Sequence, residues 1–205
     1  MGKRNRSRRP ARRAPFKEVK PLLLVVTEGA VTEPEYLNGF ARWCANPRVE
    51  IVVEPGAGAP KSIAKTAKRL KQSAEKRARG EKDDNLRYDE VWCVFDVDEH
   101  PGLPEAKQIA ASNGLKLAIS NPCIELWLLL HFREQPGIQS RNQVMDLLKS
   151  HLPDYDKHVD FKRYQARYHE AAERAGRLEQ ECIQDDEAGR NPSTGFWRLT
   201  ASIQR

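Results

Sequence analysis

Short apolar runs alternate with longer amphipathic stretches along most of the chain. Four of the runs are rich in β-branched residues and apolar on both alternating faces, which is typical of parallel strands buried under helices. They predict strands at 21–27, 49–54, 90–95 and 115–120. Helical spacing between them predicts helices at 33–44, 61–79 and 103–113, the last closed by Gly114. The alternation predicts an α/β fold with a mainly parallel, four-stranded sheet flanked by helices.

The last third of the chain has a different pattern. The segment CIELWLLLHF, 123–132, predicts a buried helix, and amphipathic spacing predicts helices at 141–150 and about 163–187. With the chain's 205 residues this gives one core domain, 21–135, and a helical extension, 136–205, packed on that core.

The net charge of +6 is concentrated at the N-terminus. Residues 1–20 hold nine Lys or Arg residues against Glu18, a net of +8, which leaves about −2 for the remainder. Having almost no apolar residues, 1–20 should be a tail that is disordered alone. It would bind phosphate backbones through counterion release, with Arg8, Arg9, Arg12 and Arg13 as the candidate contacts. A solubilising extension is the alternative.

Composition points to a cytoplasmic protein. No apolar run reaches about 18 residues, so no membrane partner is expected, and the N-terminus lacks the apolar region of a secretory signal. The four cysteines are far apart and form no CxxC pair. Cys93 and Cys123 adjoin apolar runs, which indicates small core residues in a reducing compartment.

Acidic residues follow two of the predicted strands directly. Glu28 comes after LLLVV, and Asp96 and Asp98 come after VWCVF. Because ligands bind at the carboxyl ends of strands in open α/β sheets, the three carboxylates should meet there. Oxygen donors of this kind suit Mg²⁺, with Asp96, Asp98 and Glu28 as candidate ligands, and such a site suits phosphate chemistry. Capping or turn formation is the structural alternative for the aspartates.

Neighbouring residues extend this candidate site. Gly29 would let the chain turn sharply and let a phosphate approach the backbone. Glu28 would be a general acid or base, or a third metal ligand. After the fourth strand, Asn121 and Glu125 should reach the same edge, and Glu125 needs a partner or a metal because it lies in an apolar stretch.

Other nearby side chains have a structural interpretation. Trp127 is expected in the core and His131 as a structural histidine. Glu33 and Glu35 are placed in the first turn of a helix, favoured by its dipole.

The helix predicted at 61–79 is strongly basic. Lys61, Lys65, Lys68 and Arg69 recur at helical spacing and form a stripe, either a nucleic-acid contact or a solvated face. The preceding segment, PGAGAPKS, lacks the glycine spacing of a P-loop and of a dinucleotide-binding loop, so nucleotide binding is not expected there.

Four segments in this order resemble one known family. LLVVTEGAVTEPEYL, VWCVFDVDEH, ISNPCIELWLLLHF and NPSTGFWRL are together similar to the RloB-like (AbiLii-like) proteins, whose core is a Rossmann-like TOPRIM domain. The resemblance implies a catalytic glutamate at Glu28 and an acidic pair at Asp96 and Asp98 that binds Mg²⁺ or Mn²⁺. Glu125 is then a candidate for a second-metal or orienting role, and Asn121 and Trp127 match the family's supporting residues.

The resemblance also implies an activity and partners. It implies a metal-dependent nuclease that cuts RNA, such as tRNA, or DNA in prokaryotic antiphage defence or abortive infection. An ABC-type ATPase encoded alongside would be a partner, and a homodimer stays open. No separate domain carries an evident active-site tyrosine, so a topoisomerase is not favoured.

Two alternatives remain for the function. One is a non-cleaving nucleic-acid-binding or sensor subunit, in which the tail and the basic stripe dominate. The other is a different phosphotransferase or phosphohydrolase. The acidic pair follows the third strand and only Glu28 follows the first, which fits neither a haloacid dehalogenase nor a response-regulator receiver.

Overall fold

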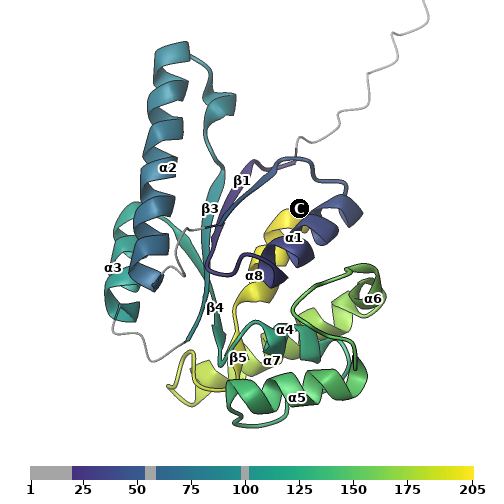
Figure 1. The fold of residues 1–205 in the computed structure, drawn as a ribbon. Helices are drawn as coiled ribbons and strands as arrows, with labels where there is room; N and C mark the ends of the chain where they lie inside the picture. The colour runs from purple at the N-terminus through teal and green to yellow at the C-terminus, as the bar shows by residue number, and fades with distance from the viewer. Residues whose placement is uncertain (1–19, 54–58, 98–101) are drawn as a thin grey trace, which may run out of the picture.

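The computed structural model describes residues 20–53, 59–97 and 102–205 (Figure 1). Its strands are β1 (Leu23–Thr27), β2 (Val49–Val53), β3 (Glu90–Asp96), β4 (Lys116–Asn121) and β5 (Ser193–Thr194). Its helices are α1 (Thr32–Trp43), α2 (Pro60–Glu81), α3 (Leu103–Asn113), α4 (Glu125–Leu130), α5 (Arg141–His151), α6 (Lys162–Gln165), α7 (Tyr168–Gln184) and α8 (Phe196–Gln204), with a 3₁₀ turn, η1 (Asp84–Leu86). The α/β class and the four predicted strands are therefore confirmed.

The strands form one sheet in the order β2-β1-β3-β4-β5. The first four are parallel, whereas β5 runs antiparallel to the end of β4 and pairs Ser193 with Asn121 and Thr194 with Ser120. The predicted four-stranded sheet is thus wrong in its strand number, since the described sheet is mixed and has five strands. The two residues of β5 are polar and form no apolar run, so no periodic signal marks them.

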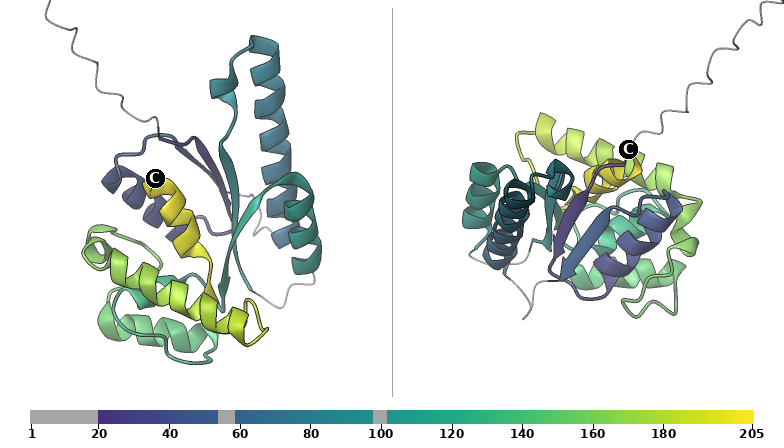
Figure 2. Two further views of the ribbon diagram at one scale, coloured as in Figure 1. Left: turned by 180° about the vertical axis from the view of Figure 1, so that it is seen from behind. Right: turned by 90° about the horizontal axis from the view of Figure 1, so that it is seen from above.

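Helices cover both faces of the sheet (Figure 2). On one face α2 and α3 pack against Leu24 and Val26 of β1, and on the other α1 and α8 lie near Leu23 and Val25. Successive side chains of a strand point to opposite faces, so a strand covered on both sides must be apolar throughout. This double burial explains why β1 reads as the uninterrupted run LLVV.

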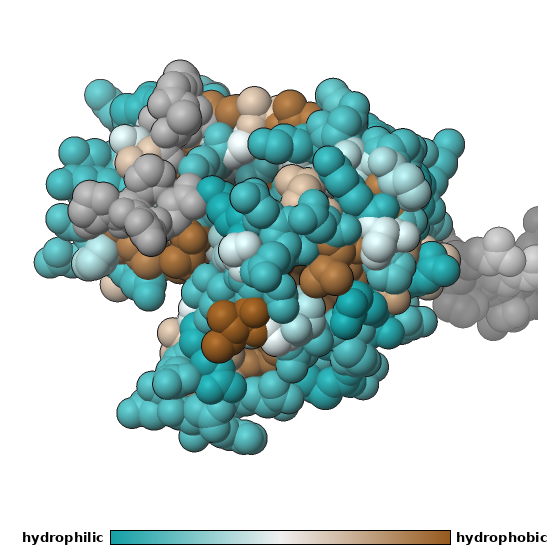
Figure 3. Space-filling model, turned by 60° about the horizontal axis from the view of Figure 1, so that its bottom comes forward, coloured by the Kyte–Doolittle hydropathy of each residue, from teal (hydrophilic) through white to brown (hydrophobic). Residues whose placement is uncertain are grey.

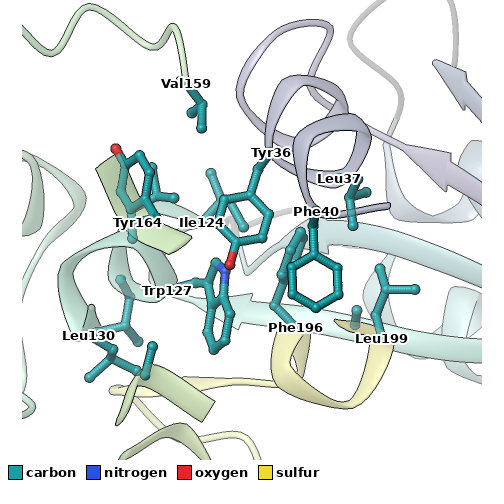
Figure 4. Close-up of a cluster of buried hydrophobic side chains, with 14 of the residues drawn as sticks. Tyr36, Leu37, Phe40, Ile124, Trp127, Leu130, Val159, Tyr164, Phe196 and Leu199 are labelled. Carbon is teal, nitrogen blue, oxygen red and sulfur yellow. The ribbon is translucent and has the colours of Figure 1, made fainter. Parts of the chain in front are cut away.

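Aromatic side chains from distant parts of the chain fill the core beneath α1 (Figure 4). Tyr36 of α1 lies edge-on to Phe161, with ring centroids 5.2 Å apart, and to Phe196 of α8, at 5.6 Å. Trp127 of α4 and Tyr164 of α6 complete the group around Tyr36. The C-terminal helices and the first helix therefore share one hydrophobic core.

His131 is a structural residue of this core, as predicted. It is fully buried, and Nε2 lies 3.0 Å from the hydroxyl of Tyr36 while Nδ1 lies 3.0 Å from the carbonyl oxygen of Trp127. Burial lowers the pKa of His131 to about 3, so the ring is neutral. In that state Nδ1–H donates to the Trp127 carbonyl and Nε2 accepts from the Tyr36 hydroxyl.

The two ends of the described chain lie side by side. The ammonium group of Lys20 donates to the carbonyl oxygens of Gln204, at 2.8 Å, and Arg205, at 3.3 Å. Lys20 precedes β1, and Arg205 pairs with Glu90, the first residue of β3. Both ends are therefore at the amino edge of the sheet.

The longest described helix is basic rather than apolar. α2 has 22 residues, eight of them Lys or Arg. Within the described ranges, no helix combines the length and the apolar character needed to cross a membrane. Cys93 and Cys123 are buried, as expected of small core residues.

Candidate functional site

A pocket of about 530 Å³ opens at the carboxyl edge of the sheet, on the side of α1, α4 and α5. Its walls come from the loop after β1, the end of β3, the starts of α4 and α5, and one residue of the α5–α6 loop. Four carboxylates line it: Glu28, Glu33, Asp96 and Glu125. The structure thus brings three predicted carboxylates together with the predicted Gly29 and adds Glu33.

The register of the parallel strands places Glu28 beside Asp96. Thr27 at the end of β1 is paired with Val94 of β3, so the two strands end at nearly the same level of the sheet. The backbone N–H of Glu28 donates to the carbonyl of Val94 at 3.1 Å, and the backbone N–H of Asp96 lies 3.4 Å from Glu28 Oε2. Asp98 lies outside the described residues.

Glu125 reaches the pocket as the first residue of α4. Its side chain is buried, and the hydroxyl of Tyr155 donates to Oε1 at 3.1 Å. The partner expected for this buried acid is thus a tyrosine from the α5–α6 loop. The carboxylate also raises the pKa of Cys123, after the larger effect of burial.

Glu33 is a member of the pocket that the sequence analysis missed. It lies in the first turn of α1 as predicted, but it is only 5% exposed and its carboxylate lies directly over Gly29. A Cβ atom at position 29 would be 2.1 Å from Glu33 Oε2, so only glycine leaves room for this approach. Gly29 therefore lets an anionic group approach the backbone, and in this structure that group is the Glu33 carboxylate.

Burial and neighbouring acids raise the pKa of two of these carboxylates, Asp96 and Glu33. Burial, followed by the charge of Glu33, raises the pKa of Asp96 well above its usual range. Burial likewise raises the pKa of Glu33, and the charges of Glu125 and Glu28 add to it. Clustered acids of this kind are stabilised by a cation.

Two cations from the C-terminal part of the chain provide such charge. Arg141 Nη2 lies 2.5 Å from Asp96 Oδ2, and Lys157 lines the same pocket. The Arg141 guanidinium opposes the rise in the pKa of Asp96 that burial causes. The sequence analysis missed both residues because they lie in amphipathic and loop segments with no acidic or glycine-rich motif beside them.

Specific contacts position both cations. Arg141 starts α5, where Ser140 and Gln143 form a capping box, and Asn191 holds Gln139 through two hydrogen bonds. The carbonyl oxygen of Lys157 accepts a hydrogen bond from Thr32 Oγ1 at 2.8 Å. The start of α5 and the α5–α6 loop are thus fixed against the pocket.

The loop is anchored a second time next to Lys157. The backbone N–H of Val159 donates to Glu35 Oε2 at 2.6 Å, and His158 Nδ1 lies 2.9 Å from Glu35 Oε1. These bonds lower the pKa of Glu35, and the pairing raises the pKa of His158. Glu35, expected only to favour the helix dipole, therefore also ties the loop to α1.

The acidic side chains of the pocket suit a hard divalent cation, because all of them are carboxylates, whose oxygen atoms such cations prefer. Within residues 20–53, 59–97 and 102–205, however, no three His, Cys, Asp or Glu side chains converge closely enough to hold a metal ion. Arg141 is the near counter-charge of Asp96 in this arrangement. Glu28, Glu33, Asp96 and Glu125 are the described residues that could supply metal ligands.

The remaining predicted residues do not line the pocket. Asn121 ends β4 and donates to the carbonyl of Gly189 at 2.9 Å, so it holds the loop before β5, and Trp127 is fully buried in the core. On α2, Lys61, Lys65 and Arg69 are exposed and Lys68 is half-buried. Arg8, Arg9, Arg12 and Arg13 lie outside the described residues.

The fold and the pocket together define an α/β protein with an acidic site at the carboxyl edge of a mostly parallel sheet. The family of RloB-like proteins matches residues 23–203, which covers nearly all described elements, and the chain therefore belongs to the RloB-like family. Comparisons with curated proteins and with solved structures gave no match.

Proposed function

We propose that this protein is a metal-dependent nuclease with a TOPRIM-type catalytic core that hydrolyses phosphodiester bonds in RNA or DNA. The observation that carries the proposal is the pocket in which Glu28, Glu33, Asp96 and Glu125 face the cations Arg141 and Lys157. Carboxylates suit a divalent cation, and the two basic side chains suit the oxygens of a phosphate. Such a combination is typical of phosphoryl-transfer sites.

Each residue has a role in this mechanism. Asp96, together with Asp98, would hold Mg²⁺ or Mn²⁺, which supplies charge neutralisation at the scissile phosphate when bound. Glu28, next to Asp96, would transfer a proton to or from water or the leaving hydroxyl. Arg141 and Lys157 would orient the phosphate through its non-bridging oxygens.

Glu33 and Glu125 would tune the site rather than react. Glu33 is buried beside Gly29 and adds negative charge near Asp96, which favours a cation there. The bond from the Tyr155 hydroxyl fixes Glu125 for a second-metal or orienting role. The exposed stripe of Lys61, Lys65 and Arg69 would add general attraction for a polynucleotide.

One observation favours a second candidate, a non-cleaving nucleic-acid-binding or sensor subunit. Arg141 already neutralises Asp96, and no three carboxylates of the described chain converge on one point. A protein that only binds nucleic acid would keep this ion pair permanently. It would then bind with a strong salt dependence and no dependence on divalent metal.

The test compares wild type with Asp96→Asn and Glu28→Gln on tRNA, plasmid DNA and single-stranded DNA, each with Mg²⁺, Mn²⁺ or EDTA. We expect metal-dependent cleavage by wild type and a loss of at least about a hundredfold in both variants. Asp84→Asn is the matched control, because Asp84 is an exposed acid of η1. Circular dichroism checks that all four proteins are folded.

The outcomes separate the two candidates. Variants that cut as fast as wild type would exclude the catalytic roles of Glu28 and Asp96. Binding without cleavage under any metal condition would favour the non-cleaving subunit. A role in antiphage defence and an ABC-type ATPase partner are proposals that rest on the family resemblance alone.

A further inference from the structure

The outer edge of β4 is only partly covered by β5. The two residues of β5 pair with Ser120 and Asn121, at the end of β4. The earlier part of β4, from Lys116 to Ile119, adjoins two hollows, one on each face of the sheet. These hollows are separate from the carboxylate pocket.

The first hollow lies beside α8 and has a volume of about 670 Å³. Trp92 of β3 forms part of its wall, with the Lys116 ammonium 5.3 Å from the centre of its ring. The half-buried Trp197 of α8 lines the same hollow. An aromatic surface and cations therefore occur together.

The second hollow lies on the opposite face, between α3 and α7, and has a volume of about 420 Å³. Leu103, Ile119 and Ile183 make it partly apolar, and Ile183 is 60% exposed. From the carboxyl edge of the sheet, Figure 3 shows the molecule notched on its left side, with hydrophobic side chains near the notch.

The two hollows adjoin each other, and the second one reaches the carboxyl edge of the sheet. Leu117 and Arg198 line both of them, so the surface passes around the edge of β4 at these residues. At the carboxyl edge of the sheet the second hollow includes Val97, which follows Asp96 directly in the chain but lies on the opposite face, because successive side chains alternate. We call this surface the β4 groove.

The β4 groove carries an excess of positive charge. The charged residues that line it are Lys107, Lys116, Arg198 and Arg205 against Glu179. Glu179 pairs with Arg198 at 2.8 Å, and nearby Glu90 pairs with Lys116 at 2.8 Å and with Arg205. Counting both acids still leaves two net positive charges, so an anionic ligand is favoured.

We propose that the β4 groove binds single-stranded nucleic acid and guides it to the carboxyl edge of the sheet, where the carboxylate pocket opens. This inference rests on the proposed nuclease function and names the substrate class as single-stranded. Grooves for single strands combine cations that follow the phosphates with aromatic side chains on which bases stack, and this groove has both. Trp197 is the aromatic side chain for stacking, and Lys107 and Arg198 are the phosphate contacts.

Other occupants fit the groove less well. A duplex hides its base faces, so it would gain nothing from Trp197 or the apolar walls. A second copy of the chain would bring Lys116 and Arg198 of both copies together, and like charges repel. An acidic peptide would satisfy the charge but gives no reason for a path that ends at the carboxyl edge of the sheet.

The test measures binding of a labelled single strand of about 12 nucleotides by fluorescence anisotropy in EDTA. All proteins carry Asp96→Asn, so cleavage does not affect the result. The groove variant is Lys107→Gln with Arg198→Gln. Its matched control is Lys149→Gln with Arg163→Gln, on α5 and α6, which removes the same charge from exposed positions.

We expect the groove variant to bind about tenfold more weakly, because two phosphate contacts are removed. The slope of log K against log salt concentration should also become less steep by about 1.4. The control should lose no more than about threefold. Trp197→Leu should weaken binding about fivefold or more while Trp197→Phe largely retains it, since phenylalanine can still stack. A duplex of the same length should bind more weakly than the single strand. Thermal melting confirms that each variant is folded.

Two results would overturn the inference: a control that loses as much affinity as the groove variant, or a groove variant that binds like its parent. A groove that binds the single strand when wild type shows no metal-dependent cleavage would refute the nuclease while keeping the groove. Cleavage that is unchanged when Lys107→Gln and Arg198→Gln are made without Asp96→Asn would keep the nuclease and refute the groove.

Discussion

At the scale of single residues, the pair of Arg141 and Asp96 is the strongest contact across the candidate site. Asp96 is mostly buried among other acids, whereas the Arg141 side chain is 44% exposed. A guanidinium that is half in solvent can leave its carboxylate at modest cost. A divalent cation at Asp96 would therefore have to compete with Arg141.

Replacing Arg141 should make metal binding easier. In Arg141→Gln we expect Mn²⁺ to bind about fivefold more tightly, on the order of 1 kcal/mol, because a competing charge is removed. Isothermal titration measures this without any substrate. Arg163→Gln, which breaks the exposed pair with Asp154, is the control and should bind Mn²⁺ like wild type. Weaker binding in Arg141→Gln would show that Arg141 supports the metal site instead.

Glu33 should lower the stability of the protein at neutral pH. Its pKa is raised in the folded state, so the folded protein holds the proton more tightly than the unfolded chain does. The ionised form thus costs stability above the folded pKa, and this cost disappears below the ordinary value of 4.5.

The variant Glu33→Gln should therefore be more stable than wild type at pH 8, by about 0.5–2 kcal/mol. The difference should vanish as the pH falls to about 4. Urea unfolding at several pH values measures it, with Glu81→Gln, on the exposed end of α2, as control. A variant that is less stable than wild type at pH 8 would contradict the expectation.

At the scale of elements, uninterrupted apolar runs predicted β1 and β3 because strands buried on both faces need them, whereas β2 and β4 are only partly buried and were found from shorter apolar stretches. The same signal could not find β5, which is polar. The sequence analysis also assigned no helix to the stretch that forms α8, although Phe196 and Leu199 are fully buried in it. β5 owes its place to pairing with β4, whereas Phe196, Leu199 and Ile203 recur at helical spacing in α8, so that helix had a local signal that was overlooked.

The limit of local patterns seen at β5 also applies to the site. Glu28 and Asp96 could be predicted because each directly follows a buried strand, and parallel strands end at one edge. Glu33 lies five residues after Glu28, with Gly29 between them. This short spacing was the signal in the sequence that could have placed Glu33 near the site. Arg141 and Lys157 reach the pocket only through the docking of α5 and its loop, which no local pattern encodes.

At the scale of the whole molecule, the C-terminal third completes the core. Tyr36 and Trp127, from the first two-thirds of the chain, pack against Phe161, Tyr164 and Phe196 from the last third. The same third supplies β5 to the sheet and both cations to the pocket. Residues 136–205 therefore contribute to both the core and the site.

A chain that ends at residue 135 should not fold, because it would expose the apolar surface that the missing helices cover. We expect no cooperative thermal transition and rapid proteolysis. In the full chain, Phe196→Ala should cost about 3–5 kcal/mol in urea unfolding. Ile138→Ala, at an 80% exposed position, is the control and should change stability by less than about 0.5 kcal/mol. A shortened chain that unfolds cooperatively would show that residues 21–135 are an independent domain.

The meeting of Lys20 with Gln204 and Arg205 has a consequence for how the protein could be joined to others. The two ends are at the amino edge of the sheet, whereas the carboxylates are at the other edge, and the seven residues of β3 between them span about 20 Å. Lys20 is thus on the side away from the pocket. A protein fused at Arg205 would emerge beside Lys20 and leave the entrance of the pocket open.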